Sequence, residues 1–327
     1  MHQPEALLPP VTSRTDYEAI RINPNIWPQA MRVICQRHGL PTERLKRFGD
    51  GTDPAYGSNV VFAVNERYII KLYPPFDKRL FEADRTVAEH VYSRLNVATP
   101  EIYVHGILEN WPYLVMSRLQ GIYLSDVWDT LEHTHQLHLV TELAELLVHL
   151  HTLPTGNLLL LESNWSTFVA DRVRNCVQFH REQGVPEHWL QQIPGYLARA
   201  APLYPPEFTP AIVSADIHEY HLLVNQEHGQ WRLCGLFDFD DARIGFHEYD
   251  LASAGLFMMW GRPALLRTFL LTYGYAEGEI NEQLNHRLMA YTLLHRYRPL
   301  NWWIREVFVK QPCSTFEELA QAIYALR

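Results

Sequence analysis

The feature that most constrains the fold of this chain is a change in hydrophobic periodicity near residue 120. Before it, apolar and β-branched residues form short runs typical of strands, with one helical pattern between them. After it, apolar residues recur at helical spacing almost to the C-terminus, most clearly from Val140 to Leu150. Strands and helices that are segregated along the chain in this way predict an α+β fold with two lobes.

The N-terminal part is expected to contain two hairpins with a helix between them. The first hairpin joins Asn59–Val64 to Tyr68–Tyr73 through the turn NER, and the second joins Ile102–Leu108 to Tyr113–Leu119. The helix is expected over Phe81–Leu95, where apolar residues follow the helical period. A further helix in the segment WPQAMRVICQRHGL belongs to an N-terminal extension, residues 1–45.

We place the lobe boundary near Ser117 to Gly121, which gives an N-terminal lobe of residues 1–118 and a C-terminal lobe of residues 119–327. In the second lobe, only AIVSADIHEYHLLVNQ and QWRLCGLFDFDDARIG interrupt the helical pattern. Both segments consist of short apolar strands beside turns rich in acidic residues or histidine. These turns are the first candidates for a functional site.

Composition excludes several classes of function. The chain carries 28 Lys+Arg against 37 Asp+Glu, a formal net charge of -9, which argues against nucleic acid as a partner. Its longest nearly apolar run is shorter than the roughly 20 residues that a membrane-spanning helix needs, so no membrane partner is expected. The N-terminus does not resemble a secretory signal, and the four cysteines are scattered. We therefore expect a cytoplasmic protein with reduced thiols.

Asp216 and Asp238 each follow a strongly apolar strand. Two carboxylates at neighbouring strand ends can face one cleft, where one orients a hydroxyl group while the other binds Mg²⁺ through oxygen. The simpler alternative is that both are turn residues that bond to the nearby backbone. Either residue taken alone favours the simpler alternative.

The order of these segments resembles the aminoglycoside phosphotransferases and their relatives, which share the protein-kinase-like fold. SADIHEYHLLV resembles the catalytic loop of that family, FDFDDARIG its metal-binding loop, and EYDLA a downstream family segment. The resemblance covers about residues 48–255. It implies that Asp216 is the catalytic carboxylate, that Asp238 binds the metal, and that Asp250 is structural.

Upstream segments resemble the nucleotide-binding elements of the same family. YGSNVVFAV is similar to the loop that covers the phosphates, which implies roles for Gly57 and Ser58, and YIIKLY is similar to the strand whose lysine contacts ATP, here Lys71. Because side chains alternate along a strand, Ile69 shares a face with Lys71 and would cover the adenine. The alternatives are a plain hairpin turn for the loop and an ordinary edge lysine for Lys71.

A lysine that binds phosphates needs a carboxylate partner, and the following helix offers Glu82 and Glu89. Seven residues separate them, so only one can pair with Lys71, and the family pattern favours Glu89. Both glutamates could instead lie on a solvated helix face. YLVMSRLQG resembles the hinge between the lobes, which implies that main-chain groups of Ser117 and Leu119 bind the adenine.

Three residues depart from the family pattern. Ser214 replaces the histidine that usually braces the catalytic loop, and Asp240 replaces a glycine of the metal loop. His221 replaces the asparagine that usually binds a second Mg²⁺, although imidazole suits transition metals better. His221 could bind a metal, touch a phosphate or form a hydrogen bond within the loop.

A rival interpretation treats His218 and His221, with His247 as a third ligand, as the metal site of a hydrolase. The HExxH pattern of zinc proteases is absent, and a chain with 17 histidines contains an HxxH by chance. We rank this interpretation below the kinase.

The sequence therefore predicts a kinase that transfers the γ-phosphate of ATP, with Mg²⁺, to a hydroxyl group of an aminoglycoside or similar amino-sugar alcohol. GTP in place of ATP remains open. So do a kinase of another alcohol, such as choline, a sugar or an amino alcohol, and a catalytically impaired nucleotide-binding protein. The substrate is expected to be a hydroxylated, cationic small molecule, and the protein a monomer or a weak dimer. Acidic residues near the loops would attract that cation, although they could equally be solvated surface residues, namely Glu219, Asp240, Asp241 and Glu248.

Overall fold

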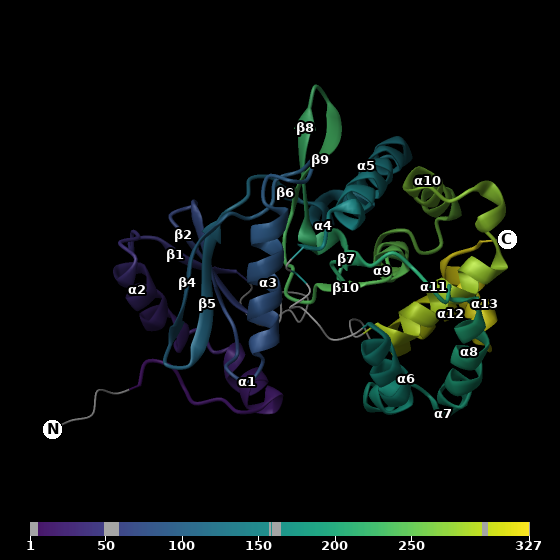
Figure 1. Ribbon diagram of the computed structural model, residues 1–327, viewed down its shortest axis with the longest axis horizontal. Helices are drawn as coiled ribbons and strands as arrows, with labels where there is room; N and C mark the ends of the chain where they lie inside the picture. The colour runs from purple at the N-terminus through teal and green to yellow at the C-terminus, as the bar shows by residue number, and fades with distance from the viewer. Residues whose placement is uncertain (1–5, 49–58, 157, 159–164, 296–299, 327) are drawn as a thin grey trace. The chain divides into compact units, whose positions relative to one another are not determined.

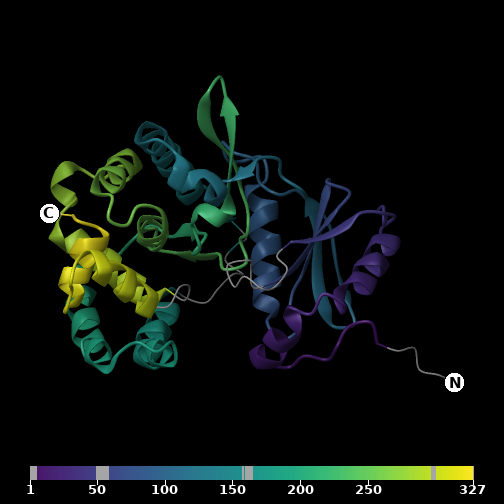
Figure 2. The ribbon, with the colours of Figure 1, turned by 180° about the vertical axis from the view of Figure 1, so that it is seen from behind.

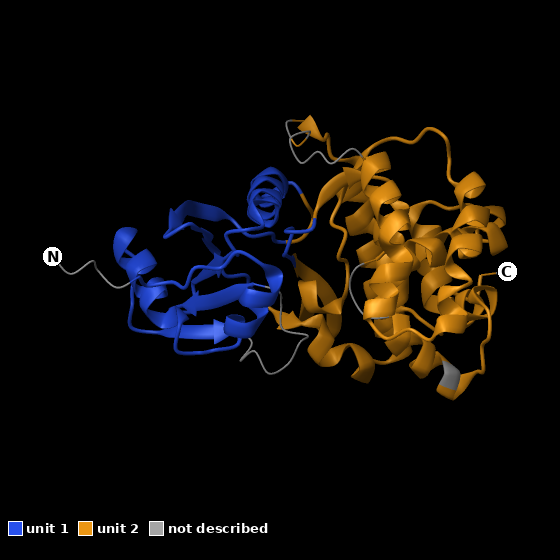
Figure 3. Cartoon of the chain, turned by 90° about the horizontal axis from the view of Figure 1, so that it is seen from below, with its two compact units in different colours: residues 1–94, 98–120, 236–241 blue, residues 95–97, 121–235, 242–327 orange. Residues whose placement is uncertain are grey.

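The computed structural model describes residues 6–48, 59–156, 158, 165–295 and 300–326 (Figure 1). The chain divides into two compact units (Figure 3). Unit 1 consists of residues 1–94, 98–120 and 236–241, and unit 2 of residues 95–97, 121–235 and 242–327. The segment around Asp238 therefore belongs to the first unit although it follows most of the second in sequence. The roles predicted for the two lobes remain predictions.

A five-stranded antiparallel sheet forms the centre of unit 1, in the order β1-β2-β3-β5-β4. Its strands are β1 (Leu45–Phe48), β2 (Val60–Val64), β3 (Tyr68–Leu72), β4 (Ile102–Leu108) and β5 (Trp111–Ser117). Asn65 and Glu66 have positive φ angles in the first hairpin turn, as Glu109 and Asn110 have in the second. Asparagine tolerates this conformation, which explains why both turns fall where the sequence predicts them.

Helices cover both faces of this sheet (Figure 1). On one face, α1 (Arg14–Arg21) and α2 (Trp27–Arg37) pack on a core that includes Ile70 and Leu72. On the other face, α3 (Lys78–Val91) packs on Tyr73 and Ile69. Alternation along β3 thus separates its apolar residues between two cores and turns Lys71 toward the α3 side.

The structure confirms the strand, strand, helix, strand, strand order but shifts several boundaries and adds two elements. Helix α3 begins at Lys78 rather than Phe81. Helix α3 ends at Val91 rather than Leu95, because Tyr92 is extended and Ser93 has a positive φ of 57°. Strand β5 starts two residues before its expected position. Helix α1 and strand β1 were not predicted, since both are short and lie in a mixed polar sequence.

Unit 2 is mostly helical (Figure 2). Its α-helices are α4 (Leu124–Val127), α5 (His133–Thr152), α6 (Trp165–Glu182), α7 (Glu187–Leu190), α8 (Ile193–Ala200), α9 (Glu248–Met258), α10 (Pro263–Tyr273), α11 (Glu282–Leu294), α12 (Leu300–Lys310) and α13 (Phe316–Ile323). Short 3₁₀ turns are η1 (Trp128–Thr130), η3 (Ala201–Leu203), η4 (Glu219–His221) and η5 (Glu277–Glu279).

Two small sheets carry the short strands predicted in unit 2. Strand β7 (Ala211–Val213) pairs with β10 (Arg243–Gly245), and β6 (Ile122–Tyr123), β8 (Leu222–Glu227) and β9 (Gln230–Leu236) form the other sheet. Both are antiparallel where their registers are known. The loop that contains Asp216 runs from β7 to η4.

Helix α9 lies at the centre of unit 2, and all of its residues are buried. The apolar stripe predicted on α5 is buried as well, which confirms the helical pattern there. Among the residues that the structure describes, no helix is both long and apolar enough to span a membrane. Burial of α9 on every side places its acidic residues, including Asp250, in an apolar environment where they require partners.

Candidate functional site

In unit 1, one lysine is surrounded by three carboxylates, and we call this group the Lys71 cluster: Lys71, Asp84, Asp238 and Asp240. Lys71 Nζ lies 2.6 Å from Asp84 Oδ2, 2.6 Å from Asp238 Oδ1 and 3.1 Å from Asp240 Oδ2. The ammonium is buried, with 7% of the lysine side chain exposed. A buried ammonium requires such compensation, because its desolvation is expensive.

Three separate elements bring these side chains together. Lys71 comes from β3 and Asp84 from the middle of α3, while Asp238 follows β9 in a backbone conformation with a φ of 71°. This conformation is uncommon for a residue with a Cβ, and it is typical of functional sites. Asp84 also accepts hydrogen bonds from Tyr73 Oη at 2.6 Å and from the Phe239 amide at 3.2 Å. Asp84 therefore links the strand, the helix and the Asp238 turn.

The charges in the cluster shift the pKa values of its members. Burial lowers the pKa of Lys71, but the charges of Asp238, Asp240 and Asp84 more than offset it, so the pKa lies well above its ordinary value. Burial and the charge of Asp238 raise the pKa of Asp240, although Lys71 opposes that shift. Lys71 is therefore a fixed positive charge, and its N–H donors are directed at Asp84, Asp238 and Asp240.

Glu89 does not pair with Lys71, so this prediction is wrong. Arg85 donates hydrogen bonds to Glu89 at 3.0 Å and to Glu82 at 2.8 Å on the exposed side of α3. The partner of Lys71 is Asp84, which lies on the buried side of the same helix with 4% of its side chain exposed. Glu82 and Glu89 thus belong to the solvated face that was the alternative for both.

In unit 2, residues 214–221 form the Asp216 loop, which is held mainly through its backbone. The buried Asp250 carboxylate accepts hydrogen bonds from the Ser214 amide at 2.8 Å and the Ala215 amide at 2.7 Å. His295 Nε2 donates to the Ala215 carbonyl at 3.1 Å. Ala215 has a φ of 64°, and these bonds stabilise that unusual conformation directly before Asp216. Asp250 thus replaces the brace that Ser214 does not provide.

Asp250 is itself oriented by a second layer of buried side chains. His151 Nε2 lies 3.1 Å from Asp250 Oδ2, and His151 Nδ1 lies 2.8 Å from Tyr273 Oη. Because a carboxylate only accepts, Nε2 carries the hydrogen, and in the neutral ring Nδ1 accepts from the tyrosine. Helices α5, α9 and α10 are therefore connected to the loop by one directional chain of hydrogen bonds.

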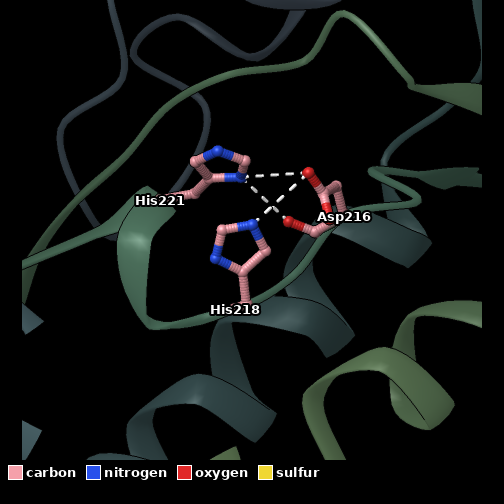
Figure 4. A group of neighbouring side chains, drawn as sticks. All are labelled: Asp216, His218 and His221. Atoms are coloured by element: carbon pink, nitrogen blue, oxygen red, sulfur yellow. Dashed lines mark hydrogen bonds and ion pairs between the residues drawn. The ribbon is translucent and has the colours of Figure 1, made fainter. Parts of the chain in front are cut away.

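Two imidazole rings face the Asp216 side chain (Figure 4). His218 Nε2 lies 3.4 Å and His221 Nδ1 lies 3.7 Å from Asp216 Oδ2. His221 Nδ1 also lies 3.0 Å from the Asp216 carbonyl oxygen. His218 caps η4, since its Nδ1 accepts a hydrogen bond from the Tyr220 amide at 3.1 Å. The donor atoms of all three side chains lie within 4.8 Å of one another.

Three more of the predicted nucleotide-binding residues, Ile69, Ser117 and Leu119, lie in or beside the sheet of unit 1. Ile69 is half-buried and packs on the α3 side, on the same face as Lys71. The Ser117 amide donates to the Glu101 carbonyl at 2.9 Å, so its N–H is engaged within the protein. Leu119 follows β5 and is half-buried. Gly57 and Ser58 lie outside the described residues.

Three of the four acidic residues that were expected to attract a cationic substrate are paired within the protein, and attraction of such a substrate stays a prediction. Asp240 contacts Lys71, Asp241 pairs with Arg79 at 3.2 Å, and Glu248 pairs with Arg287 at 2.7 Å. All three carboxylates are buried. The alternative of solvated surface residues is therefore wrong for these three.

The chemistry of the donor atoms separates two kinds of possible metal site. Asp84, Asp238 and Asp240 offer only carboxylate oxygens, which fit the hard cation Mg²⁺. The Asp216 loop offers imidazole nitrogens in addition to a carboxylate. His247 is not part of this group, since it stacks on Tyr273 with ring centres 5.4 Å apart. The rival interpretation is therefore wrong about His247, and the side chain that lies with His218 and His221 is Asp216.

Sequence reasoning missed Asp84, His151, Tyr273 and His295. Asp84 follows Leu80 and precedes Val87 and Ala88 on the buried stripe of α3, and an acidic residue on an apolar stripe is a signal that requires a buried partner. His151 lies one position after Leu150 at the end of the α5 stripe. Tyr273 and His295 carry no comparable signal, because a polar residue at or just after the end of an apolar helix is common and does not require a particular partner.

Comparison with known proteins assigns this chain to a family. Residues 52–283, more than half of the chain, match the model of the phosphotransferase enzyme family. Similar solved structures include wild-type aminoglycoside 2'-phosphotransferase-IIIa with GDP, at 16% identity and a TM-score of 0.64, covering 91% of this chain and 97% of that chain. Another is an aminoglycoside phosphotransferase with GDP and kanamycin, at 15% identity and a TM-score of 0.63, covering 90% and 96%.

A third similar structure is aminoglycoside phosphotransferase APH(3'')-Id from Streptomyces rimosus ATCC10970 with ADP and streptomycin. It is 16% identical, with a TM-score of 0.56, and the match covers 81% of this chain and 98% of that chain. At these identities the similar structures establish the fold, and the family match establishes the class. The chain therefore belongs to the phosphotransferase enzyme family, as a kinase-type enzyme with the protein-kinase-like fold.

Proposed function

We propose that this protein transfers the γ-phosphate of ATP, with Mg²⁺, to a hydroxyl group of an aminoglycoside or a similar amino-sugar alcohol. The observation that carries this proposal is the pairing of a buried, charged Lys71 with Asp84 of α3 and Asp238. An ammonium fixed in this way can hold the phosphates of a nucleotide, because phosphoryl transfer depends on positioning and charge stabilisation. Similar structures that contain GDP, ADP or ATP support a nucleotide.

Each unit supplies a different part of the reaction. Asp216 accepts the proton of the acceptor hydroxyl, and the hydrogen bonds from Ser214 and Ala215 to Asp250 keep its backbone in place. Asp238 would hold Mg²⁺ through carboxylate oxygen. When bound, Mg²⁺ neutralises charge on the phosphates. Lys71 binds the same phosphates as a fixed cation.

The adenine lies against Ile69 and bonds to main-chain groups at the end of β5. The Ser117 amide is engaged with Glu101, so Ser117 would contribute its carbonyl oxygen and Leu119 its backbone. We assign Gly57 and Ser58 to the loop that covers the phosphates, on the family resemblance alone. GTP in place of ATP changes only this base contact.

The role of His221 is within the Asp216 loop. A carbonyl oxygen only accepts, so the 3.0 Å contact with Asp216 O supports a ring with hydrogen on Nδ1. Imidazole is also a poor ligand for Mg²⁺. A hydrogen bond that shapes the loop is thus better supported than the direct Mg²⁺ ligation first expected for His221.

An acceptor panel tests the substrate class. Purified full-length protein is incubated with ATP, Mg²⁺ and kanamycin, gentamicin, streptomycin, choline or simple sugars, and phosphorylated product is measured. Turnover with aminoglycosides supports the proposal, since such compounds are bound by similar structures. Turnover only with another alcohol would replace the substrate class, and nucleotide binding without any turnover would indicate a catalytically impaired protein.

The Asp216→Asn variant tests the mechanism. We expect turnover to fall by about 10² to 10⁴ while nucleotide affinity stays unchanged, because the lost group acts on the acceptor proton. Asp171→Asn is the matched control, since this acid is exposed on α6 and forms an ion pair with the exposed Arg174. Unchanged turnover in Asp216→Asn would remove this residue from the reaction.

A further inference from the structure

The Asp216 loop combines three donor atoms in a geometry close to that of a metal site (Figure 4). His218 Nε2 and His221 Nδ1 lie 3.4 and 3.7 Å from the same oxygen, Asp216 Oδ2. In a tetrahedral zinc site with bonds of about 2.1 Å, neighbouring ligand atoms are about 3.4 Å apart. A zinc ion would therefore require only small movements of these three side chains.

The type of donor selects the kind of ion. Two imidazole nitrogens and one carboxylate oxygen match the ligands of zinc sites that keep a fourth position open. Mg²⁺ prefers oxygen ligands alone, so it does not compete well for such a group. The three side chains are between 10% and 16% exposed, which leaves them accessible to an ion from solution.

The loop is fixed before any ion binds. Asp250 and His295 hold the Ala215 peptide from both sides, and the two imidazole rings lie with centres 4.0 Å apart. Because the ligands are already oriented, binding of the ion costs little conformational entropy.

Coordination of zinc would break one hydrogen bond at each of the two imidazole rings. His221 would move its hydrogen from Nδ1 to Nε2 and lose the bond to the Asp216 carbonyl. His218 would carry its hydrogen on Nδ1 and lose the bond from the Tyr220 amide. Each is a single neutral hydrogen bond, which contributes much less free energy than a zinc site provides.

We propose that the Asp216 loop binds one Zn²⁺ through Asp216, His218 and His221, and that this ion inhibits the enzyme. Zinc would occupy the carboxylate that accepts the proton of the acceptor hydroxyl. Inhibition rests on the proposed function, whereas the binding itself does not. Other chains of this fold that carry a different residue in place of either histidine would lack the site.

Isothermal titration of Zn²⁺ into the nucleotide-free full-length protein, in excess Mg²⁺, tests the binding. We expect one Zn²⁺ per chain, and at least a tenfold loss of affinity in His218→Gln and in His221→Asn. His149→Asn is the control, because this histidine is exposed on α5 and should leave the affinity unchanged. Imidazole NMR signals of the wild-type protein on zinc addition give the same information without a substitution.

Equal zinc affinity in the wild-type protein and both loop variants would overturn the site, as would the absence of one-to-one binding. These results do not depend on turnover, so failure of the proposed kinase activity is distinguishable. Once an acceptor is known, zinc should inhibit the wild-type enzyme but not His218→Gln at the same concentration. Full activity of the zinc-loaded wild-type enzyme would overturn the inhibitory role.

Discussion

The Lys71 cluster of unit 1 and the Asp216 loop of unit 2 are held by different kinds of interaction. In the cluster, one ammonium is shared among three carboxylate side chains. In the loop, one carboxylate accepts two backbone amides, and a histidine donates to the carbonyl between them. The interactions of the cluster fix the position of the Lys71 ammonium, while those of the loop fix the backbone directly before Asp216.

This difference predicts different responses to substitution. If one carboxylate of the cluster is lost, the remaining two still compensate the charge of Lys71. If Asp250 is lost, no other described side chain accepts from Ser214 and Ala215, and their amides are left buried without partners. The loop should therefore be more sensitive than the cluster.

The largest effect is expected for Asp250→Ala. Two buried amides and His151 lose their acceptor together, so the free energy of unfolding should fall by about 4 kcal/mol. Urea unfolding of the full-length protein measures this change. Asp171→Ala, an exposed acid of the same unit, should change it by less than about 0.5 kcal/mol. A loss in Asp250→Ala no larger than the control would show that the loop has other support.

The next effect is expected for Asp84→Ala, which removes the acceptor of Lys71, Tyr73 and the Phe239 amide. We expect a loss of about 3 kcal/mol and weaker nucleotide binding, because Lys71 keeps its other two carboxylates. Glu89→Ala is the matched control on the same helix, with an expected change below about 0.5 kcal/mol for an exposed pair. Equal losses in the two variants would restore Glu89 as the functional partner.

The sequence alone predicts well the strands, helix and loop that carry both sites. It predicts less well which side chains form hydrogen bonds and ion pairs with the site residues. The hairpin of β2 and β3, helix α3 and the loop after β7 follow directly from hydrophobic periodicity and turn residues. The resemblance directs attention to Lys71, Asp216 and Asp238, which the structure places in the Lys71 cluster and the Asp216 loop.

The partners were harder to predict for a physical reason. Asp84 and Glu89 lie on one helix, and which of them faces Lys71 depends on where α3 begins and how it turns against the sheet. Periodicity locates such boundaries only to within a few residues. His295 and Tyr273 lie 80 and 122 residues from their partners in sequence, and no local pattern encodes these contacts.

Low pH should decrease the free energy of unfolding through His247. Burial, with smaller contributions from the neighbouring His151 and Arg287, lowers the pKa of His247 to about 4. Below pH 6.5 the His247 side chain binds a proton in the unfolded chain, whereas in the folded protein it stays neutral down to about pH 4. The free energy of unfolding therefore falls as the pH drops toward 4. Between pH 7 and 4.5 this one group contributes a loss of about 2 kcal/mol. His247→Asn should reduce the acid-induced loss by that amount in urea unfolding, and an unchanged loss would contradict the assignment.

The smallest effect is expected for Asp240→Asn, which tests whether the cluster contains more carboxylates than Lys71 requires. Asparagine keeps an acceptor for Asn59 Nδ2, now 2.6 Å from Asp240 Oδ2, but removes a charge that repels Asp238. At pH 7 we expect the free energy of unfolding to stay the same or rise by up to about 1 kcal/mol.

The pH dependence of the stability difference between Asp240→Asn and the wild-type protein is a more specific test. The pKa of Asp240 is raised in the folded protein by burial and by Asp238, so this carboxyl group lowers stability as the pH rises above its unfolded value of 3.8. The advantage of asparagine should therefore be largest at pH 7 and shrink toward pH 4, where the aspartate is neutral as well. A loss of more than about 1 kcal/mol at pH 7 would mean that Lys71 needs all three carboxylates. In that case the cluster would be as sensitive as the Asp216 loop, and the contrast between the two units would not hold.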